Sequence, residues 1–573
     1  MMLHYLLGRG ESEPGFVARN IHWQISVNIN GTITGVTPVG DEKTGHRVNK
    51  CPSMHNMNAG GRSHFMVESI QNAAFFFKEG TEETEKLKPR HEFFWNLIKE
   101  ASEGEPRLEP LCRLYANTAE MDKMRSMLDE KKAKPTQWVQ FTVGEFDPLS
   151  ENTVLEWWRK WRQKDLAASK KTSKKAQPFD QMLCLLSGEL IEPALTHDKV
   201  KGLAGVGGLG TGDVVAGFDK DAFQSYGLDK SKNAAMGEEV MTAYVSGLNN
   251  FLEESSRKLG NAKVTHWFDR TVPLEDDVLG FLDDPSDPNQ QKQEAAAAKQ
   301  RATALLEAIR TGKRPDLASN KYFALTLSGA SGRVMVRDWM EGSFMELVDN
   351  IAAWFNDLQI VRRDDASSLA PEPKFLAVAG SMVRELKELM GPTVQHLWRV
   401  AIRNQPIPHA FLAQALHRFR VDITSGETPN HARMGLMKAY FIRKGDTQMA
   451  AYLNPDHPDA AYHCGRLMAV LSRLQYAALG DVGANVVQRY YIAASQTPAL
   501  VFGRLMSNAK NHLNKLDGGL AHWYEGKIAE VMAQMGDSMP RTLDLERQSL
   551  FALGYYQQLA ADRQVKANKE EKE

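Results

Sequence analysis

The stretch YFALTLSGASGRVMVRDWM, residues 322–340, is the last β-rich part of the sequence before a long region with helical patterns. Two β-rich runs flank the turn-forming residues 329–332, which predicts an antiparallel hairpin. Leu325, Leu327, Val334 and Val336 alternate with other residues, so we expect a half-buried sheet here. After residue 373 the β-rich runs almost vanish. Apolar residues then recur at helical spacing in FLAVAGSMVRELKELM (375–390), PHAFLAQALHRFRV (408–421), AYHCGRLMAVLSRLQYAAL (461–479) and PALVFGRLMSNAKNHLNKL (498–516).

The chain before the hairpin mixes strands and helices. HWQISVNINGTITGVTPVG (22–40) alternates polar and apolar residues around Asn30 and Gly31, a strong hairpin signal. We therefore predict an α+β N-terminal region with mixed, mainly antiparallel strands and helices, and an all-α C-terminal helical bundle. The expected domains are a mixed α/β domain at 1–180, a continuation with a glycine loop and the hairpin at 181–373, and the bundle at 374–573.

The composition excludes several classes of protein. The chain has 573 residues, of which 42% are hydrophobic and 25% charged, and its net charge is −1, so it is not a globally basic, histone-like protein. Its four cysteines are widely spaced without a CxxC pair, which argues against a disulfide framework and a zinc ribbon. No stretch approaches the roughly 18–20 apolar residues of a membrane span, and the start lacks the basic region of a signal peptide. We expect a cytoplasmic protein without membrane contact.

The glycine-rich run GVGGLG, residues 205–210, has the form G-x-G-x-x-G. A dinucleotide site also requires a hydrophobic strand before the glycines and a helix after them. Here HDKVKGLA precedes the run, and TGDVVAGF, which looks extended, follows it; no GK[ST] of a P-loop is present. A nucleotide-dependent enzyme built on this loop therefore remains only the alternative function. A flexible loop is the simpler interpretation, and exposed N–H groups beside Lys199 and Lys201 would also suit a DNA groove or phosphate backbone.

Other catalytic patterns are missing from the sequence. The 16 histidines form no HExxH, no G-x-S-x-G occurs, and the paired aspartates at 276–277 and 283–284 lie in polar stretches. We therefore predict a protein that is not an enzyme, with no catalytic residue, no metal site and no cofactor.

Basic residues accumulate in the helical part of the chain. Residues 391–520 contain 14 Lys or Arg and 7 Asp or Glu, a density suited to tracking a nucleic-acid backbone. Trp157, Trp158 and Trp161 alternate with basic residues on one expected helix, where a buried Trp face with a solvated basic face is the simpler interpretation.

Three blocks of sequence resemble one known family in the same order. The first comprises CLLSG (184–188), HDKVKG (197–202), the glycine loop and AFQSYG (222–227); the second is the hairpin YFALTLSGASGRVMVRDW (322–339). The third comprises LNP (453–455), YHCGRL (462–467) and SQTP (495–498). These blocks resemble the large, signature subunit of the type I-C Cascade, a CRISPR RNA-guided DNA surveillance complex.

The resemblance implies a noncatalytic role. Large subunits of this family recognise the short motif beside the target (the PAM) in duplex DNA, help to open the duplex and stabilise the displaced strand, whereas base pairing with the guide reads the target sequence. Cleavage is left to a recruited helicase–nuclease. The implied partners are guide RNA, target DNA, the repeat-handle-binding subunit, the backbone multimer and small subunits made from the C-terminal part of the same gene.

Three sets of candidate residues follow from this hypothesis. Loops of the N-terminal part should contact PAM DNA, because small residues permit close approach and Asn or Lys can bond base edges; the candidates are Lys50, Asn58, Gly60, Gly61, Arg62, Ser63, Lys199, Lys201, Gly205, Gly207 and Gly208. The displaced strand should lie along Arg399, Arg403, Arg433, Arg466, Arg473, Arg489 and Arg504. Internal translation should start at Met434, Met437 or Met449, with a modest preference for Met449, which leaves 125 residues.

Overall fold

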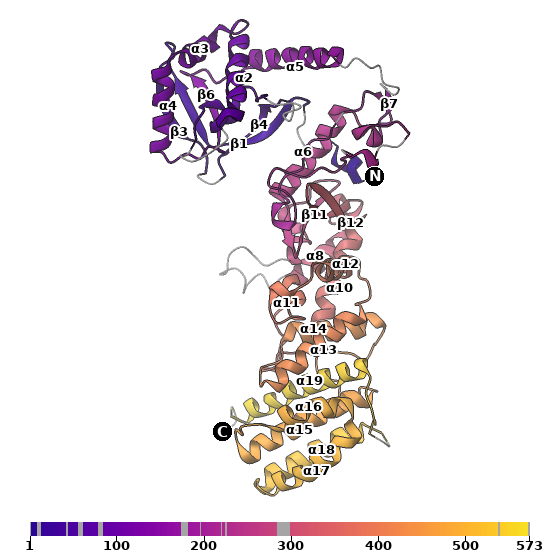
Figure 1. Cartoon of the computed structure of the whole chain (residues 1–573). Helices are drawn as coiled ribbons and strands as arrows, with labels where there is room; N and C mark the ends of the chain where they lie inside the picture. The colour runs from indigo at the N-terminus through magenta and orange to yellow at the C-terminus, as the bar shows by residue number, and fades with distance from the viewer. Residues whose placement is uncertain are drawn as a thin grey trace. The chain divides into compact units, whose positions relative to one another are not determined.

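The computed structural model describes residues 2–7, 13–41, 44–54, 61–77, 84–172, 181–194, 196–218, 220–223, 226–282, 298–536 and 539–570 (Figure 1). Contacts divide the chain into two compact units. Unit 1 contains residues 1–255 and 329–335, and unit 2 contains residues 256–328 and 336–573. The expected domain boundaries at 180 and 373 stay predictions.

A four-stranded sheet forms the centre of the N-terminal part of unit 1. Its strand order is β3 (Ile33–Pro38), β2 (Trp23–Val27), β6 (Trp138–Val143) and β5 (Val67–Ser69). Only the β2–β6 pair is parallel, and β2 and β3 form the expected hairpin, in which Gly31 has a φ of 86°. That left-handed conformation favours glycine, which explains the turn signal.

Helices cover this sheet because their apolar faces bury a shared core. Trp95, Phe141 and Trp158 are fully or almost fully buried there. The helices are α1 (Ile70–Ala73), α2 (Thr84–Ser102), α3 (Glu109–Ala116), α4 (Thr118–Glu130) and α5 (Asn152–Thr172). A separate two-stranded ribbon pairs β1 (Phe16–Ile21) with β4 (His46–Pro52) in antiparallel register.

The remainder of unit 1 consists mostly of short elements. The strands β7 (Met182–Leu183) and β8 (Leu190–Ile191) pair, and the glycine loop follows them. The helix α6 (Glu238–Glu254) ends this part of unit 1. Its first turn contains the acidic residues Glu238 and Glu239, which suit the positive end of the helix dipole.

Unit 2 begins with a second four-stranded sheet. The order is β12 (Arg333–Ser343), β11 (Lys321–Ala330), β10 (Ala262–Phe268) and β9 (Arg257–Leu259). The expected hairpin is present, but β11 is buried on both faces because it is an inner strand, whereas Val336 is 44% exposed. The expectation of a half-buried alternation at Val336 was therefore wrong.

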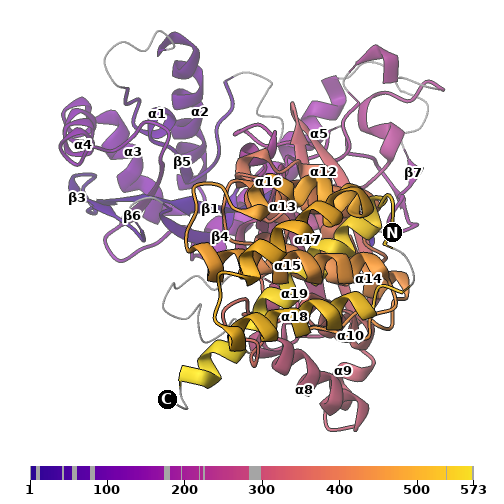
Figure 2. The ribbon, with the colours of Figure 1, turned by 90° about the horizontal axis from the view of Figure 1, so that it is seen from below.

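Helices make up the rest of unit 2, and the predicted fold class is confirmed. Helix α15 packs against α16, α17, α18 and α19 (Figures 1 and 2). Apolar residues of α10, α13, α14, α15 and α19 belong to one continuous core cluster. The helices are α8 (Ala298–Arg310), α9 (Pro315–Ala318), α10 (Phe344–Leu358), α11 (Phe375–Gly380), α12 (Gly391–Ile402), α13 (His409–Thr424), α14 (His431–Lys444), α15 (Ala460–Leu479), α16 (Val486–Gln496), α17 (Pro498–Leu513), α18 (Gly518–Ala533) and α19 (Leu545–Glu570).

Candidate nucleic-acid interface

Buried polar contacts join Ser53 and Met54 to Arg19 and His64. Arg19 of β1 donates to the Ser53 hydroxyl (3.3 Å) and lies 3.0 Å from His64 Nε2. The Met54 N–H donates to His64 Nδ1 at 3.0 Å. Asn58 and Gly60 of the candidate set lie outside the described residues. Ser53 and His64 are thus both held by Arg19 of β1.

Glu68 organises the chain around Ser63 and His64. Its buried carboxylate accepts hydrogen bonds from the Ser63 hydroxyl (2.7 Å), the His64 N–H (2.8 Å) and the Asn72 amide (3.0 Å). Burial alone would raise the pKa of Glu68, but the hydrogen bonds from the backbone N–H groups of His64 and Ser69 and from the Ser63 hydroxyl lower it below its usual value. Burial, and then the Arg19 charge, lower the pKa of His64 to about 3, so the imidazole is neutral at physiological pH.

Two of the expected DNA contacts in this region serve the scaffold. Arg62 makes a bidentate ion pair with Asp165 of α5 at 2.8 and 3.0 Å, and the Ser63 side chain is fully buried on Glu68. We therefore reassign Arg62 and Ser63 to positioning the loop. Gly61 has a φ of 68°, and Lys50 remains exposed at 53% of its side chain, 3.9 Å from Glu13.

The glycine loop packs against the tip of the β11–β12 hairpin. Gly207 has a φ of 91°, and a Cβ there would lie 2.7 Å from the Gly329 carbonyl oxygen. A Cβ on Gly329 would overlap the backbone of Gly208. Glycine is required here by close backbone approach, whereas Gly205 has open space around its Cβ position.

The buried side chain of Asp213 stabilises the contact between the glycine loop and the hairpin tip. Its fully buried carboxylate accepts the Leu209 N–H at 3.2 Å and the Gly332 N–H at 3.0 Å. Val214 continues the connection, because its N–H donates to the Gly332 carbonyl and its own carbonyl accepts from the Val334 N–H, both at 2.9 Å. The glycine loop is thus tied to a β-hairpin.

This geometry differs from a dinucleotide site. Gly205 lies in a single 3-10 turn (Ala204–Val206), and in the described residues that follow the glycine loop the first α-helix begins at Glu238. A helix N-terminus directly after the glycines, which such a site needs for the pyrophosphate, is therefore missing from the described part.

The lysines beside the glycine loop are exposed. Lys199 Nζ lies 3.5 Å from the Thr211 hydroxyl, and the Lys201 backbone N–H donates to Asn249 of α6 at 2.7 Å. The neighbouring Asn250 accepts from Arg47 of β4 at 2.6 Å. Helix α6 thus holds both the start of the glycine loop and strand β4. Arg47 was not among the candidates, because its partner Asn250 lies 203 residues away and no local pattern connects the two.

The Trp-rich helix α5 follows the simpler interpretation on its aromatic face. Trp158 is fully buried and stacks on Phe65 and Trp161, with ring centroids 5.6 and 5.5 Å apart. Its two arginines are paired: Arg159 binds Glu13 and Arg162 binds Glu238. These cations therefore stabilise unit 1.

Part of the basic excess of the helical region lies inside the protein. Arg433 is buried and pairs with Asp422, and its Nε donates to the Ser381 carbonyl at 2.7 Å. Arg466 is fully buried and donates to Gln558 (2.9 Å) and Glu530 (3.1 Å). These two guanidinium groups have no face for a phosphate, so the structure removes them from the candidate set.

The other candidate arginines reach the surface of unit 2. Arg399 is 43% exposed but is paired with Asp338, with N–O distances of 3.0 and 2.7 Å. Arg403, Arg489 and Arg504 are exposed, and Arg504 lies 5.8 Å from the ring of Tyr490. Basic and aromatic side chains are the two kinds of group that sites for single-stranded nucleic acids combine. Arg473 is half-buried and lines a cavity.

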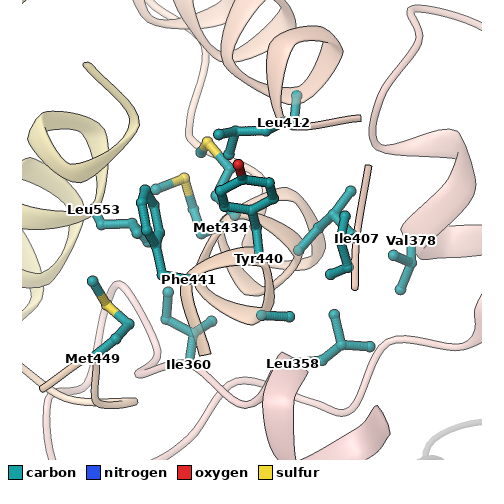
Figure 3. Packing of buried hydrophobic residues seen from close by; sticks show 14 of the residues in the cluster. Leu358, Ile360, Val378, Ile407, Leu412, Met434, Tyr440, Phe441, Met449 and Leu553 are labelled. Atoms are coloured by element: carbon teal, nitrogen blue, oxygen red, sulfur yellow. The ribbon is translucent and has the colours of Figure 1, made fainter. Parts of the chain in front are cut away.

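The candidate start methionines are all buried in the core of unit 2. Met434 and Met437 lie within α14, and Met449 lies between α14 and α15. Figure 3 shows Met434 and Met449 in the same cluster as Phe441 and Leu553. A chain beginning at Met449 would contain α15 to α19 whole.

The described residues contain no group of three or more His, Cys, Asp or Glu side chains placed to hold a metal ion. Cys51, Cys112, Cys184 and Cys464 are all free thiols. Within the same residues, no helix combines the length and the apolar character that a membrane crossing requires.

Comparisons with known proteins identify the family of the chain. No curated protein matches it. A family model described as CRISPR-associated protein (Cas_Csd1) matches residues 6–562, nearly the whole chain, in agreement with the resemblance to the type I-C large subunit. The chain therefore belongs to the Cas_Csd1 family of CRISPR-associated proteins and is a subunit of a CRISPR effector complex.

Proposed function

We propose that this protein is the noncatalytic large subunit of a type I-C Cascade, which recognises the PAM in duplex DNA, helps to open the duplex and stabilises the resulting R-loop. The observation that carries the proposal is the family match over residues 6–562. Its partners are guide RNA, target DNA, the repeat-handle-binding subunit, the backbone multimer and a recruited helicase–nuclease. The complex acts in the cytoplasm.

PAM recognition is assigned to loops of unit 1. The support is that both candidate loops are anchored by buried polar groups, Arg19 and Glu68 at one and Asp213 at the other. A loop with a fixed base can present its remaining residues to a DNA groove without a large loss of entropy on binding. The exposed lysines Lys50, Lys199 and Lys201 then supply charge for the phosphate backbone.

Stabilisation of the displaced strand is assigned to the helical part of unit 2. Its exposed Arg403, Arg489 and Arg504 support this role, together with the half-buried Arg473. Phosphate contacts position a strand without reading its sequence, so this function should be uniform across targets.

A small subunit made by internal translation is also part of the proposal. Met449 is favoured as its start because Met434 and Met437 lie inside α14, so a chain beginning at either would carry a fragment of that helix. The 125 residues from Met449 retain α15 packed on α16, α17, α18 and α19. That arrangement supports an independently folding bundle.

Co-purification tests the proposed function. A tagged full-length chain should isolate guide RNA and the backbone subunits, and the assembled complex should bind PAM-bearing duplex with a log–log salt slope of about −0.9 per phosphate contact. A chain that purifies without RNA or Cascade subunits, from cells that express all of them, would contradict the proposal.

A further inference from the structure

A polar cavity of about 410 Å³ lies in unit 2, within the region assigned to the displaced strand. It is bordered by α15, by the loop 480–485 and by α19. Its lining includes Ser472, Arg473, Gln475, Tyr476, Asn485 and Arg563. The volume falls within the range of small-molecule sites, and the lining is richer in hydrogen-bonding groups than most of them.

Two arginines, Arg473 and Arg563, line this cavity, and the charge of Arg363 acts on Arg563. Arg563 Nη1 donates to the Arg363 carbonyl at 3.2 Å, and Arg473 is held beside the Tyr524 hydroxyl and the buried Asp562. Burial lowers the pKa of Arg563, and the charges of Arg363 and Arg473 lower it further. Guanidinium groups that repel one another in a partly buried site are stabilised by a bound anion.

The carboxylates near the cavity leave room for such an anion. The charge of Asp364 raises the pKa of Arg563, but Asp364 forms its own ion pair with Arg362 at 2.9 Å. Asp562 lies behind Arg473, where burial raises its pKa. Asp481 lines the cavity and would oppose a second negative charge.

An aromatic side chain stands in the same lining. Tyr476 is 67% exposed, which is unusual for a large side chain next to a cavity. The wall around it is held in shape, because Gln475 accepts the Val486 N–H at 2.7 Å and Asn485 caps α16. A fixed wall with a free ring offers a stacking platform for a flat ligand.

We infer that this cavity binds one nucleotide of a single DNA strand, with its phosphate between Arg473 and Arg563 and its base stacked on Tyr476. The inference rests on the proposed function and deepens it, because it gives the displaced strand a specific subsite. A duplex cannot use this site, since its bases are stacked in pairs and are not available to the ring. Inorganic phosphate alone would leave the stacking surface unused.

The experiment measures binding of short oligonucleotides to the full-length chain by fluorescence anisotropy. Tyr476→Leu and Arg563→Gln should each weaken single-stranded DNA binding, Tyr476→Leu by roughly 5- to 150-fold, which corresponds to the 1–3 kcal/mol of one base stack. Asp481→Asn should tighten it, because a repulsive charge is removed. Duplex DNA of the same sequence should be unaffected by Tyr476→Leu. Unchanged thermal unfolding of Tyr476→Leu, whose side chain is exposed, shows that any loss is not unfolding.

The outcomes separate the cavity from the proposed function. If Tyr476→Leu and Arg563→Gln bind as the wild type does while Arg489→Ala weakens binding, the cavity assignment fails and the displaced-strand role stands. If none of the three weakens binding, both fail. An RNA oligonucleotide that binds more tightly through Tyr476 than DNA of the same sequence would overturn the assignment to the displaced strand.

Discussion

The contact between the glycine loop and the hairpin tip can be broken by adding one methyl group. A Cβ on Gly329 would overlap the backbone N and Cα of Gly208, and no flexible side chain is present there to move away. Gly329→Ala should therefore push the loop off the hairpin and lengthen the bonds that Asp213 accepts from Leu209 and Gly332.

The size of the effect follows from overpacking. An extra methyl group in a close-packed contact typically costs about 1–3 kcal/mol. If opening of the loop becomes easier by that amount, exchange of the protected amides should accelerate roughly 5- to 150-fold. The amides concerned are those of Leu209, Asp213 and Val214, which donate to the Asp213 carboxylate and to the Val200 and Gly332 carbonyls.

Hydrogen exchange followed by mass spectrometry measures this directly on the full-length chain. Gly210→Ala is the matched control, because it lies in the same loop, its φ is outside the left-handed region and nothing lies within 4 Å of its Cβ position. Exchange in Gly210→Ala should equal that of the wild type. Equal exchange in Gly329→Ala and Gly210→Ala would refute the reasoning that the hairpin fixes the loop.

Three further predictions concern stability and processing. Arg433→Ala should lower the free energy of unfolding by about 1–3 kcal/mol in urea titrations, because the buried Asp422 loses one of its two arginine partners and keeps only Arg418, whereas the exposed Arg489→Ala should leave it unchanged; similar values would contradict the assignment of Arg433 to the interior. Acidification from pH 7 to pH 5 should destabilise unit 1 by up to about 2 kcal/mol. In the unfolded chain the imidazole of His64 takes up a proton near its ordinary pKa of about 6.5, whereas in the folded chain its pKa is about 3. Protonation therefore favours the unfolded chain over this range of pH. A thermal midpoint of unit 1 that does not fall over this range would contradict that account. Met449→Leu, a volume-conserving change, should abolish the 125-residue C-terminal product in mass spectra of the purified complex while full-length protein remains; persistence of that product would exclude Met449 as its start.

The sequence allowed the fold class to be predicted because its signals are local. Asn30 and Gly31 specify a tight turn through the positive φ that glycine tolerates, and the helical spacing after residue 373 reflects a continuous buried stripe. The exposure of Val336 was not predictable in this way, because it depends on whether a strand lies inside a sheet or at its edge.

The candidate site was harder to predict because burial of charge is set by tertiary partners. Arg433 and Arg466 are basic residues on helices like Arg489, and only the positions of Asp422, Gln558 and Glu530 place them inside. The same holds for Arg62, whose partner Asp165 lies 103 residues away. The Gly208–Gly329 contact joins a glycine run that was interpreted as a flexible loop to the turn of a predicted hairpin, and neither local signal indicates the other.

Binding of the assembled complex to two forms of one target tests the central claim most directly. The forms are a PAM-bearing duplex and the same target strand supplied single-stranded, each measured with wild-type protein and with Lys199→Ala combined with Lys201→Ala. Both lysines are exposed beside the anchored glycine loop. We predict that the double variant binds the duplex less tightly and the single strand as tightly as the wild type does. Equal loss on both forms would contradict the claim that unit 1 reads duplex DNA.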